Sequence, residues 1–262
     1  MMARRQVRVV AIVSTFALLA VAPARGADPD LESLRRDVNE LKRDLAEIKE
    51  LLKQGAAGRA PFSAAPGSGT AAADAVVRVA GYPAMGRPTA RIAIVEFSSY
   101  QCPYCRRHFE RTLPQIKKTF VDEGKVQYVF HDVPLQGQPD SPNAAKAAWC
   151  ARQQAPDKFW PMHDTLFRNQ RNLSVESLKG YAQGLGLDGA AFSACLDGAP
   201  ATEALSRSSA EAVAVGVRGT PTFFIGPTED GTMVRGRRLI GAQSFETFRQ
   251  AIEIELDQLT KK

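Results

Sequence analysis

Residues 28–54 carry a helical pattern of apolar and polar positions. Apolar residues recur there at alternating steps of three and four, at Leu31, Leu34, Val38, Leu41, Leu45, Ile48 and Leu52. These are the a and d positions of a heptad repeat, which is typical of a coiled coil. The pattern predicts a coiled-coil helix, and a single amphipathic helix lying on its own domain is the alternative.

Charges beside this seam favour association with a second copy. In a parallel assembly, Asp37 at a g position would face Lys42 at an e position of the neighbour. Asp44 and Lys49 repeat this pairing one heptad later. The following residues, 55–74, are rich in Gly, Ala, Ser and Pro and predict a flexible linker. We expect a homo-oligomer through this helix; the mixture of Leu, Val and Ile leaves dimer and trimer open.

Strand and helix patterns alternate over residues 75–262. Short apolar runs predict strands at "RIAIVEF", "KVQYVFHDVPL", "TPTFFIG" and "RRLIGA". A helix is expected to begin near Pro103, because proline suits a first turn, and to bend at Pro114. Helical patterns fill residues from about 139 to 215, and "SFETFRQAIEIELDQL" predicts a last helix. This order predicts an α/β fold with an inserted helical domain.

The first 26 residues have the layout of a secretory signal. Three arginines among the first eight residues precede an apolar run over residues 9–22 and then small residues. Such a run is short for a membrane span, although an uncleaved anchor is the alternative. Residues 22–24 and 24–26 both offer a cleavage site. We expect cleavage of this signal and a location in the periplasm.

Composition narrows the possible partners. A chain of 262 residues with 44% hydrophobic content can bury a core in one domain or two. Removing Arg4, Arg5 and Arg8 with the signal lowers the formal net charge from +6 to +3. This modest surplus, without a basic stripe interleaved with aromatic residues, excludes nucleic acid as an expected partner. Outside the cytosol, the four cysteines could persist as disulfides.

Cys102 and Cys105 form a C-x-x-C motif at the expected start of a helix. A thiolate is the nucleophile of disulfide exchange, and a helix N-terminus favours a thiolate through its free N–H groups and partial positive charge. We expect Cys102 to be the exposed attacking thiol and Cys105, one turn further, to be buried and to resolve the mixed disulfide. The alternatives are an inert disulfide and a metal site that includes His108, which extends the motif to C-x-x-C-x-x-H.

The segment from about residue 76 onward resembles the DsbA-like thiol–disulfide oxidoreductases. The matching stretches are "IAIVEFSSYQCPYC", "CARQQAPDKFWPMHDTLF", "LGLDGAAFSACL" and "GVRGTPTFFIG". The resemblance implies a thioredoxin fold with a helical insertion. It also implies that Pro221 is a cis proline facing the cysteines and that Thr220 lends its backbone to substrates. Pro103 and Tyr104, between the cysteines, are assigned to the same substrate-binding surface.

Glu96 matches the position of the buried acid found beneath the second cysteine in thioredoxin-like proteins. A buried carboxyl with a raised pKa could take the proton from Cys105 as that thiol attacks. The alternative for Glu96 is a solvated residue at the end of a strand.

Two features set this chain apart from the strongly oxidising DsbA proteins, which carry Pro-His between the cysteines. Tyr104 replaces that histidine and lacks its positive charge, which puts the oxidising strength in doubt. Thr220 resembles the isomerase-like members, whereas simple oxidases often have valine. When these features are combined with the expected coiled coil, the chain looks like the oligomeric suppressor-of-copper-sensitivity C proteins.

Cys150 and Cys195 lie in two expected helices of the insertion. A disulfide between them would close a loop of about 45 residues and stabilise the fold by about 4 kcal/mol in the chain-entropy model. Two buried free thiols are the alternative. We assign the pair a structural role, because it lacks the local geometry of a redox motif.

The expected activity is disulfide isomerase or oxidoreductase chemistry on periplasmic client proteins, with a membrane redox partner. Net oxidation of dithiols is the alternative within this class, and sequestration of copper or zinc is the alternative outside it. The redox-active cysteine pair is expected to work without another cofactor and without a metal.

Overall fold

The computed structural model describes residues 34–46, 49, 75–233 and 235–261. The expected signal, the expected linker and the seam residues Leu31, Ile48 and Leu52 lie outside the described residues. The chain separates into two compact units, Met1–Ala65 and Pro66–Lys262. Each unit is described by itself.

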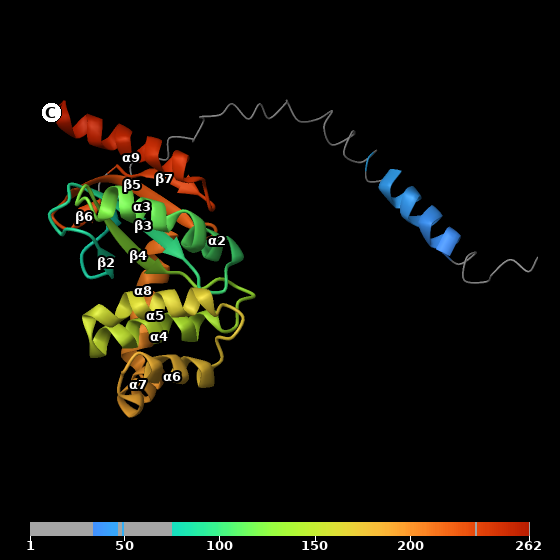
Figure 1. The fold of residues 1–262 in the computed structure, drawn as a ribbon, viewed down its shortest axis with the longest axis horizontal. Helices are drawn as coiled ribbons and strands as arrows, with labels where there is room; N and C mark the ends of the chain where they lie inside the picture. Colours follow the sequence, from blue (N-terminus) through green and yellow to red (C-terminus); the bar gives the residue numbers. More distant parts are fainter. Residues whose placement is uncertain (1–33, 47–48, 50–74, 234, 262) are drawn as a thin grey trace, which may run out of the picture. The chain divides into compact units, whose positions relative to one another are not determined.

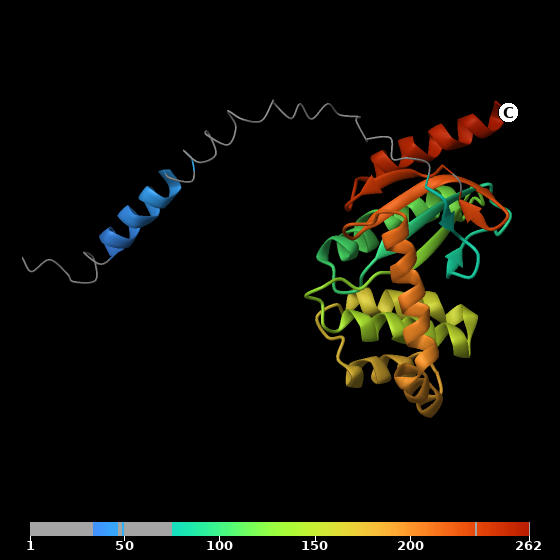
Figure 2. The same cartoon turned by 180° about the vertical axis from the view of Figure 1, so that it is seen from behind.

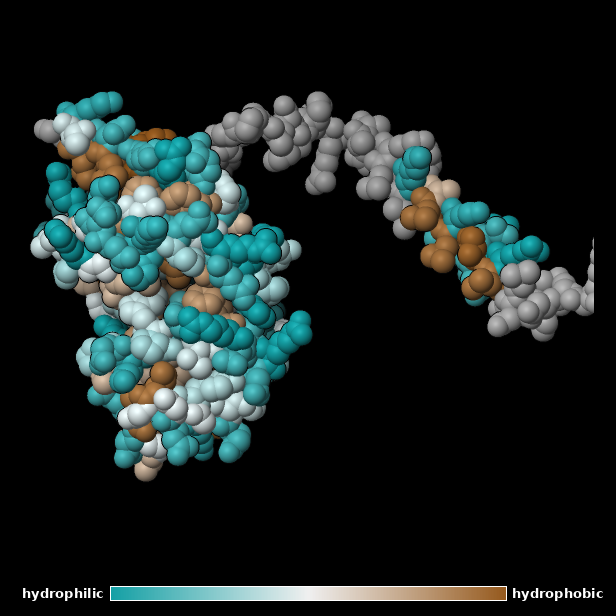
Figure 3. All heavy atoms as spheres, in the orientation of Figure 1, coloured by the Kyte–Doolittle hydropathy of each residue, from teal (hydrophilic) through white to brown (hydrophobic). Residues whose placement is uncertain are grey.

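Residues 34–46 form a helix in the first unit. Its four described seam residues are exposed by 42% to 63%: Leu34, Val38, Leu41 and Leu45. These apolar side chains gather along one side of the helix in Figure 3. The helix is therefore amphipathic, with an apolar stripe that no described residue covers. Its association with a second copy remains a proposal.

A mixed sheet forms the centre of the second unit (Figure 1). Strand β3 (Ile92–Ser98) pairs in parallel with β4 (Val126–Asp132) and antiparallel with β5 (Thr222–Glu229). Strand β7 (Arg237–Ile240) adds to the other side of β5. These four strands lie where the apolar runs predicted them.

Three two-residue strands extend the sheet: β1 (Val77–Arg78), β2 (Ala84–Met85) and β6 (Thr232–Met233). The order within the described residues is β1-β6-β5-β3-β4-β2. None of the three was predicted, because two residues are too few to show an alternation of apolar and polar positions.

The two faces of the sheet are buried differently. Ile92 and Ile94 of β3 point to one face, where they pack with α3 (Leu113–Ile116) and α9 (Phe245–Thr260). Because side chains alternate along a strand, Glu96 belongs to this same face. Apolar residues of β3 on the opposite face pack against Phe224 of β5 and the end of the insertion.

Helix α2 (Pro103–Arg111) ends at Thr112, and α3 begins there with Pro114 in its first turn. Proline has no N–H to donate, and its ring clashes with the carbonyl one turn earlier, so one continuous helix cannot pass through Pro114. A π-helical segment, Lys117–Val121, completes the connection to β4. The bend predicted at Pro114 is present as a break between two helices.

The helices expected between residues 139 and 215 are also present. They are α4 (Ser141–Gln154), α5 (Phe159–Arg168), α6 (Val175–Gly184), α7 (Gly189–Asp197) and α8 (Ala199–Ala214). Figure 2 shows α8 running from this helical domain back to the sheet. A disulfide joins Cys150 of α4 to Cys195 of α7, with their Cα atoms 5.9 Å apart. No described helix has the length and apolarity required to span a membrane.

Candidate functional site

The C-x-x-C motif occupies the first turn of α2. Cys102 is the N-cap residue, Pro103 takes the first helical position and Cys105 follows one turn inside. The Cys102 carbonyl accepts a hydrogen bond of 3.1 Å from the Arg106 N–H, as the first bond of the helix. Both thiols therefore lie at the end of the helix where free N–H groups stabilise a negative charge. Both are free thiols in this structure.

Cys102 is only 4% exposed. The expectation of an exposed attacking thiol was wrong in this respect. The loop with Thr220 and the cis Thr220–Pro221 peptide bond lies over the sulfur, and the Cys102 thiol donates to the Thr220 carbonyl at 3.2 Å. This cover comes from Thr220, 118 positions along the chain, and the sequence placed it at the cysteines through the family resemblance, which implied a cis Pro221 facing them.

The two thiols differ strongly in acidity. A hydrogen bond from the Cys105 side chain lowers the pKa of Cys102 to about 5, and the Thr220 side chain and backbone N–H groups add to this effect against the opposing effect of burial. Burial raises the pKa of the fully buried Cys105 thiol well above its ordinary value. At neutral pH, Cys102 is therefore the thiolate and Cys105 is the thiol that stabilises it.

Glu96 lies beneath the cysteines and is 2% exposed, as expected for a buried acid. Burial raises the pKa of Glu96 to about 7, although the hydrogen bond from Tyr128 and the nearby Ser98 side chain oppose the shift. A group with this pKa can accept and release a proton near neutral pH. The carboxylate of Glu96 in turn raises the pKa of Cys105, so the two groups interact.

Tyr128 and His108 extend this buried polar cluster. The Tyr128 hydroxyl donates to Glu96 Oε2 at 2.6 Å and lies 2.9 Å from His108 Nε2. Since that hydroxyl has one hydrogen, His108 Nε2 must donate to it. Burial lowers the pKa of His108 to about 3, so the ring is neutral. His108 Nδ1 has no hydrogen-bond partner among the described residues.

Ser98 of β3 affects both the buried acid Glu96 and the resolving thiol Cys105. Its side chain lowers the pKa of Glu96 and also that of Cys105. Its buried hydroxyl has no hydrogen-bond partner among the described residues. The sequence analysis missed Ser98 and Tyr128. The only available signal was a polar residue directly after one apolar strand run, at Ser98, and a hydroxyl-bearing side chain inside another, at Tyr128.

Two glutamines hold the motif against the helical insertion. Gln170 Nε2 donates to the carbonyls of Tyr100 and Cys102 at 2.7 and 2.8 Å. Gln101 Oε1 accepts from the backbone N–H groups of Asp140 and Ser141 at 2.8 Å each, where α4 begins. The insertion therefore fixes the loop before Cys102.

A shallow pocket of about 370 Å³ opens beside the covered sulfur. Its lining residues are Tyr104, Arg107, Gly219, Thr220, Pro221, Ile240, Gly241, Ala242 and Gln243. Tyr104 and Ile240 are 56% and 62% exposed, which makes this surface apolar and accessible. The structure thus brings together Tyr104, Thr220 and Pro221, whereas Pro103 lies at the helix start and does not line the pocket.

His108 does not join the cysteines as the metal-site alternative requires. Its ring packs against Phe223 and Phe248, with centroids 4.4 and 5.2 Å away, and bonds to Tyr128. Across the described residues, no group of three or more His, Cys, Asp or Glu side chains is arranged to hold a metal ion.

A family model described as thioredoxin matches residues 79–254, which include strands β2 to β7, the motif and the insertion. The chain belongs to the thioredoxin family. This thioredoxin-family protein is also similar in sequence to disulfide bond formation protein D of Bacillus subtilis. The two are 35% identical over 98 residues, which cover 37% of this chain and 44% of that protein.

Other relatives are much longer than this chain. The Na(+)/H(+) antiporter NhaA of Herminiimonas arsenicoxydans is 36% identical over 168 residues, covering 64% of this chain. The match spans only 24% of the antiporter. The similarity is therefore to a segment of a larger protein.

Solved structures identify the DsbA-like form of the fold. The crystal structure of Wolbachia pipientis alpha-DsbA1 matches with a TM-score of 0.62 at 22% identity, covering 70% of this chain and 94% of that one. BdbD from Bacillus subtilis matches with a TM-score of 0.63 at 24% identity, covering 71% and 98%. At these identities the likeness concerns the fold, and it includes the helical insertion.

Proposed function

We propose that this protein is a thiol–disulfide oxidoreductase that acts on client proteins through Cys102 and Cys105. The carrying observation is the difference between the two thiols, because the pKa of Cys102 is lowered to about 5 while that of the buried Cys105 is raised. A thiolate at the end of a helix beside a protonated partner is the arrangement that disulfide exchange requires. The names of the Bacillus relatives support the same activity.

The exchange proceeds in two steps. The Cys102 thiolate attacks one sulfur of a client disulfide, which forms a mixed disulfide and releases the other client sulfur as a thiolate. That thiolate can attack elsewhere in the client, so that the disulfides rearrange without net oxidation. Alternatively, Cys105 loses its proton to Glu96 and attacks the Cys102 sulfur, which reduces the client and leaves a Cys102–Cys105 disulfide.

The pocket beside the sulfur is the proposed client-binding surface. Tyr104 and Ile240 offer exposed apolar contacts, and the loop before Pro221 offers backbone groups to an extended peptide. Cys102 is 4% exposed and the pocket opens beside it, so we place the approach of a client sulfur along this pocket. Client contacts with Tyr104, Thr220 and Pro221 follow from this path, with Pro103 orienting the turn.

Within this activity we favour isomerase or oxidoreductase turnover in the periplasm over net oxidation. An isomerase needs its cysteines reduced by a membrane reductant, whereas a net oxidase needs a quinone-linked oxidase. Thr220 and the apolar stripe of the N-terminal helix support the first assignment, as features of the oligomeric isomerase type that the sequence resembles. The cysteine pair would be the only redox group required.

Trapping of mixed disulfides tests the proposal. Cys105→Ser should accumulate covalent adducts with periplasmic proteins on non-reducing gels, because the resolving thiol is absent. Cys102→Ser should form none. Adducts formed by Cys102→Ser alone would reverse the two roles, and the absence of adducts in both variants would overturn the activity. The reduction potential of the pair, measured in a glutathione buffer, then decides between isomerase and oxidase.

A further inference from the structure

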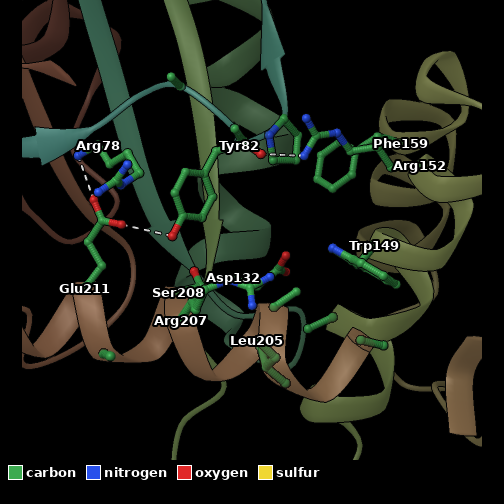
Figure 4. Close-up of a pocket in the computed structure, with 17 residues that line it drawn as sticks. Arg78, Tyr82, Asp132, Trp149, Arg152, Phe159, Leu205, Arg207, Ser208 and Glu211 are labelled. Atoms are coloured by element: carbon green, nitrogen blue, oxygen red, sulfur yellow. Dashed lines mark hydrogen bonds between the residues drawn. The ribbon is translucent and has the colours of Figure 1, made fainter. Parts of the chain in front are cut away.

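A second and larger cavity lies away from the cysteines. Its volume is about 690 Å³, within the range of small-molecule sites. It opens between the loop from β1 to β2 and two helices of the insertion, α4 and α8 (Figure 4). Neither Cys102 nor Cys105 lines it, so disulfide exchange does not explain it.

The polar groups that face this cavity are mainly hydrogen-bond donors. Arg78, Arg152 and Arg207 line it from three different elements. Arg152 uses one N–H to bond the Gly81 carbonyl at 2.7 Å, which leaves further guanidinium donors. Among the described residues, Arg207 has a distant contact of 3.9 Å with Glu203, and its side chain is 66% exposed.

The acids of the lining are less available than the arginines. Glu211 accepts from the Arg78 backbone N–H at 2.6 Å and from the Tyr82 hydroxyl at 2.9 Å, so both of its oxygens are engaged. Burial raises the pKa of Asp132 well above its usual range, which favours a neutral carboxyl that can donate. The cavity therefore carries a surplus of positive charge and of donors.

Two buried oxygens belong to residues of the cavity wall. Ser208 is 3% exposed, and its hydroxyl makes no hydrogen bond to any described residue. The same holds for Asp132 Oδ1, whose residue lines the cavity from the end of β4. Both oxygens are closed off from the open space, so the groups that can contact an occupant are the arginines and the aromatic side chains.

Aromatic side chains form the remaining walls. Figure 4 shows Tyr82 on one side and Trp149 and Phe159 on the other, with the nitrogen end of the Trp149 indole directed into the space. Leu205 of α8 adds apolar surface below. These walls suit a flat apolar body, while the arginines suit a carboxylate, which guanidinium groups bind through paired hydrogen bonds.

We propose that this cavity is a binding site for a small organic carboxylate with a flat apolar body. The carboxylate bonds to the arginines, and the apolar body lies between Tyr82 and Trp149. This site is independent of the proposed thiol chemistry, since it contains neither reactive cysteine.

Calorimetric titration of the purified protein with 2-naphthoate tests the site. We expect saturable binding of one molecule per chain, weakened about tenfold by Arg207→Gln through loss of a charge-assisted contact. Ala204→Phe should block the cavity without removing a charge, because Ala204 lines it on α8. Arg171→Gln is the matched control, since Arg171 is exposed and lies outside the lining. Thermal unfolding checks that each variant is folded.

Two further titrations separate the parts of the ligand. The neutral analogue 2-naphthalenemethanol should bind at least about tenfold more weakly, and inorganic phosphate should not compete. Equal binding of the neutral analogue would overturn the role of the arginines. Competition by phosphate would overturn the need for an apolar body. Unchanged naphthoate binding in Arg207→Gln and Ala204→Phe, or no binding to the parent protein, would overturn the site itself.

Discussion

Few groups stabilise the negative charge of the Cys102 thiolate, so each of them affects its chemistry. The Cys105 thiol is the main donor, and Thr220 faces the same sulfur from above with two different groups. The Thr220 carbonyl accepts a hydrogen bond from the Cys102 thiol. The Thr220 hydroxyl is not occupied by another partner among the described residues, and this side chain lowers the pKa of Cys102. Thr220 thus serves both protonation states of Cys102, first as an acceptor and then as a donor.

The first prediction concerns the acidity of Cys102. Its alkylation rate in reduced protein should increase with pH around a midpoint of about 5 and stay level above pH 7, because the thiolate is already formed there. Thr220→Val removes a donor to the thiolate and should raise this midpoint. It should also make the pair less oxidising, since the reduced form loses stabilisation.

The pH dependence of iodoacetamide labelling and the potential in a glutathione buffer measure both effects. Arg171→Gln, an exposed change outside the site, is the control. A midpoint near the ordinary thiol pKa would contradict the assignment of Cys102 as the attacking group. An unchanged midpoint and potential in Thr220→Val would remove Thr220 from the site.

The second prediction concerns Glu96 and stability. Its folded pKa of about 7 lies above the ordinary value of 4.5, so between these pH values the unfolded chain loses the proton first. Stability should therefore fall as pH rises through this window, by roughly 3 kcal/mol at about 1.4 kcal/mol per pKa unit. Glu96→Gln, which cannot ionise, should not show this fall.

Urea unfolding of both proteins between pH 4.5 and 8 provides the measurement. Glu229→Gln, at an exposed position, should behave as the parent protein does. Parallel curves for the parent and Glu96→Gln would show that Glu96 has an ordinary pKa. The same variant should slow the release of mixed disulfides, because Cys105 would lose its proton acceptor.

Sequence reasoning reached some of these residues and not others for a physical reason. Cys102, Cys105 and Glu96 lie in one continuous stretch, where a motif and a strand pattern are visible together. Tyr128 reaches Glu96 only because β4 lies beside β3, so its role depends on sheet register. Thr220 and Pro221 were placed at the cysteines through the family resemblance, whereas the burial of Cys102 beneath them depends on how the fold brings in their loop.

At the scale of elements, the break between α2 and α3 and the helices of the insertion followed from local signals. A proline in a helix interior kinks or breaks the helix, so Pro114 was a visible signal. Helical periodicity is visible because it persists over ten or more residues. The strands β1, β2 and β6 have only two residues each, and pairing alone defines them. Long elements with a strong period were therefore predictable, and the edge strands were not.

The third prediction concerns the disulfide between α4 and α7. Its cysteines are 45 residues apart, and a cross-link of this length stabilises by about 4 kcal/mol in the chain-entropy model. Exchanging Cys150 and Cys195 for alanine should lower the unfolding temperature of the protein. Calorimetry measures this effect, and the labelling rate of Cys102 should stay nearly unchanged. Loss of labelling without loss of stability would contradict a structural role for the pair.

At the scale of the whole molecule, the first unit and the thioredoxin-family unit have separate requirements. The second unit contains the motif, the acid and both pockets, so exchange chemistry needs nothing from the first. The helix over 34–46 nevertheless presents an exposed apolar stripe, which a second copy would cover. Its charged residues Asp37 and Lys42 suit a parallel neighbour.

The fourth prediction connects this stripe with isomerase activity. Several active sites around a shared space can attack one client repeatedly at a high effective concentration. The resemblance to oligomeric isomerases implies that association also restricts access of a membrane oxidase. Deletion of residues 30–54 should therefore give a folded monomer with an unchanged potential of the Cys102–Cys105 pair. It should lose the ability to unscramble a misbridged substrate and keep or gain dithiol oxidation. Light scattering measures the association state, and a refolding assay with a misbridged substrate measures the unscrambling activity. A monomeric full-length protein would contradict the coiled coil, whereas a monomer that unscrambles equally well would separate association from activity.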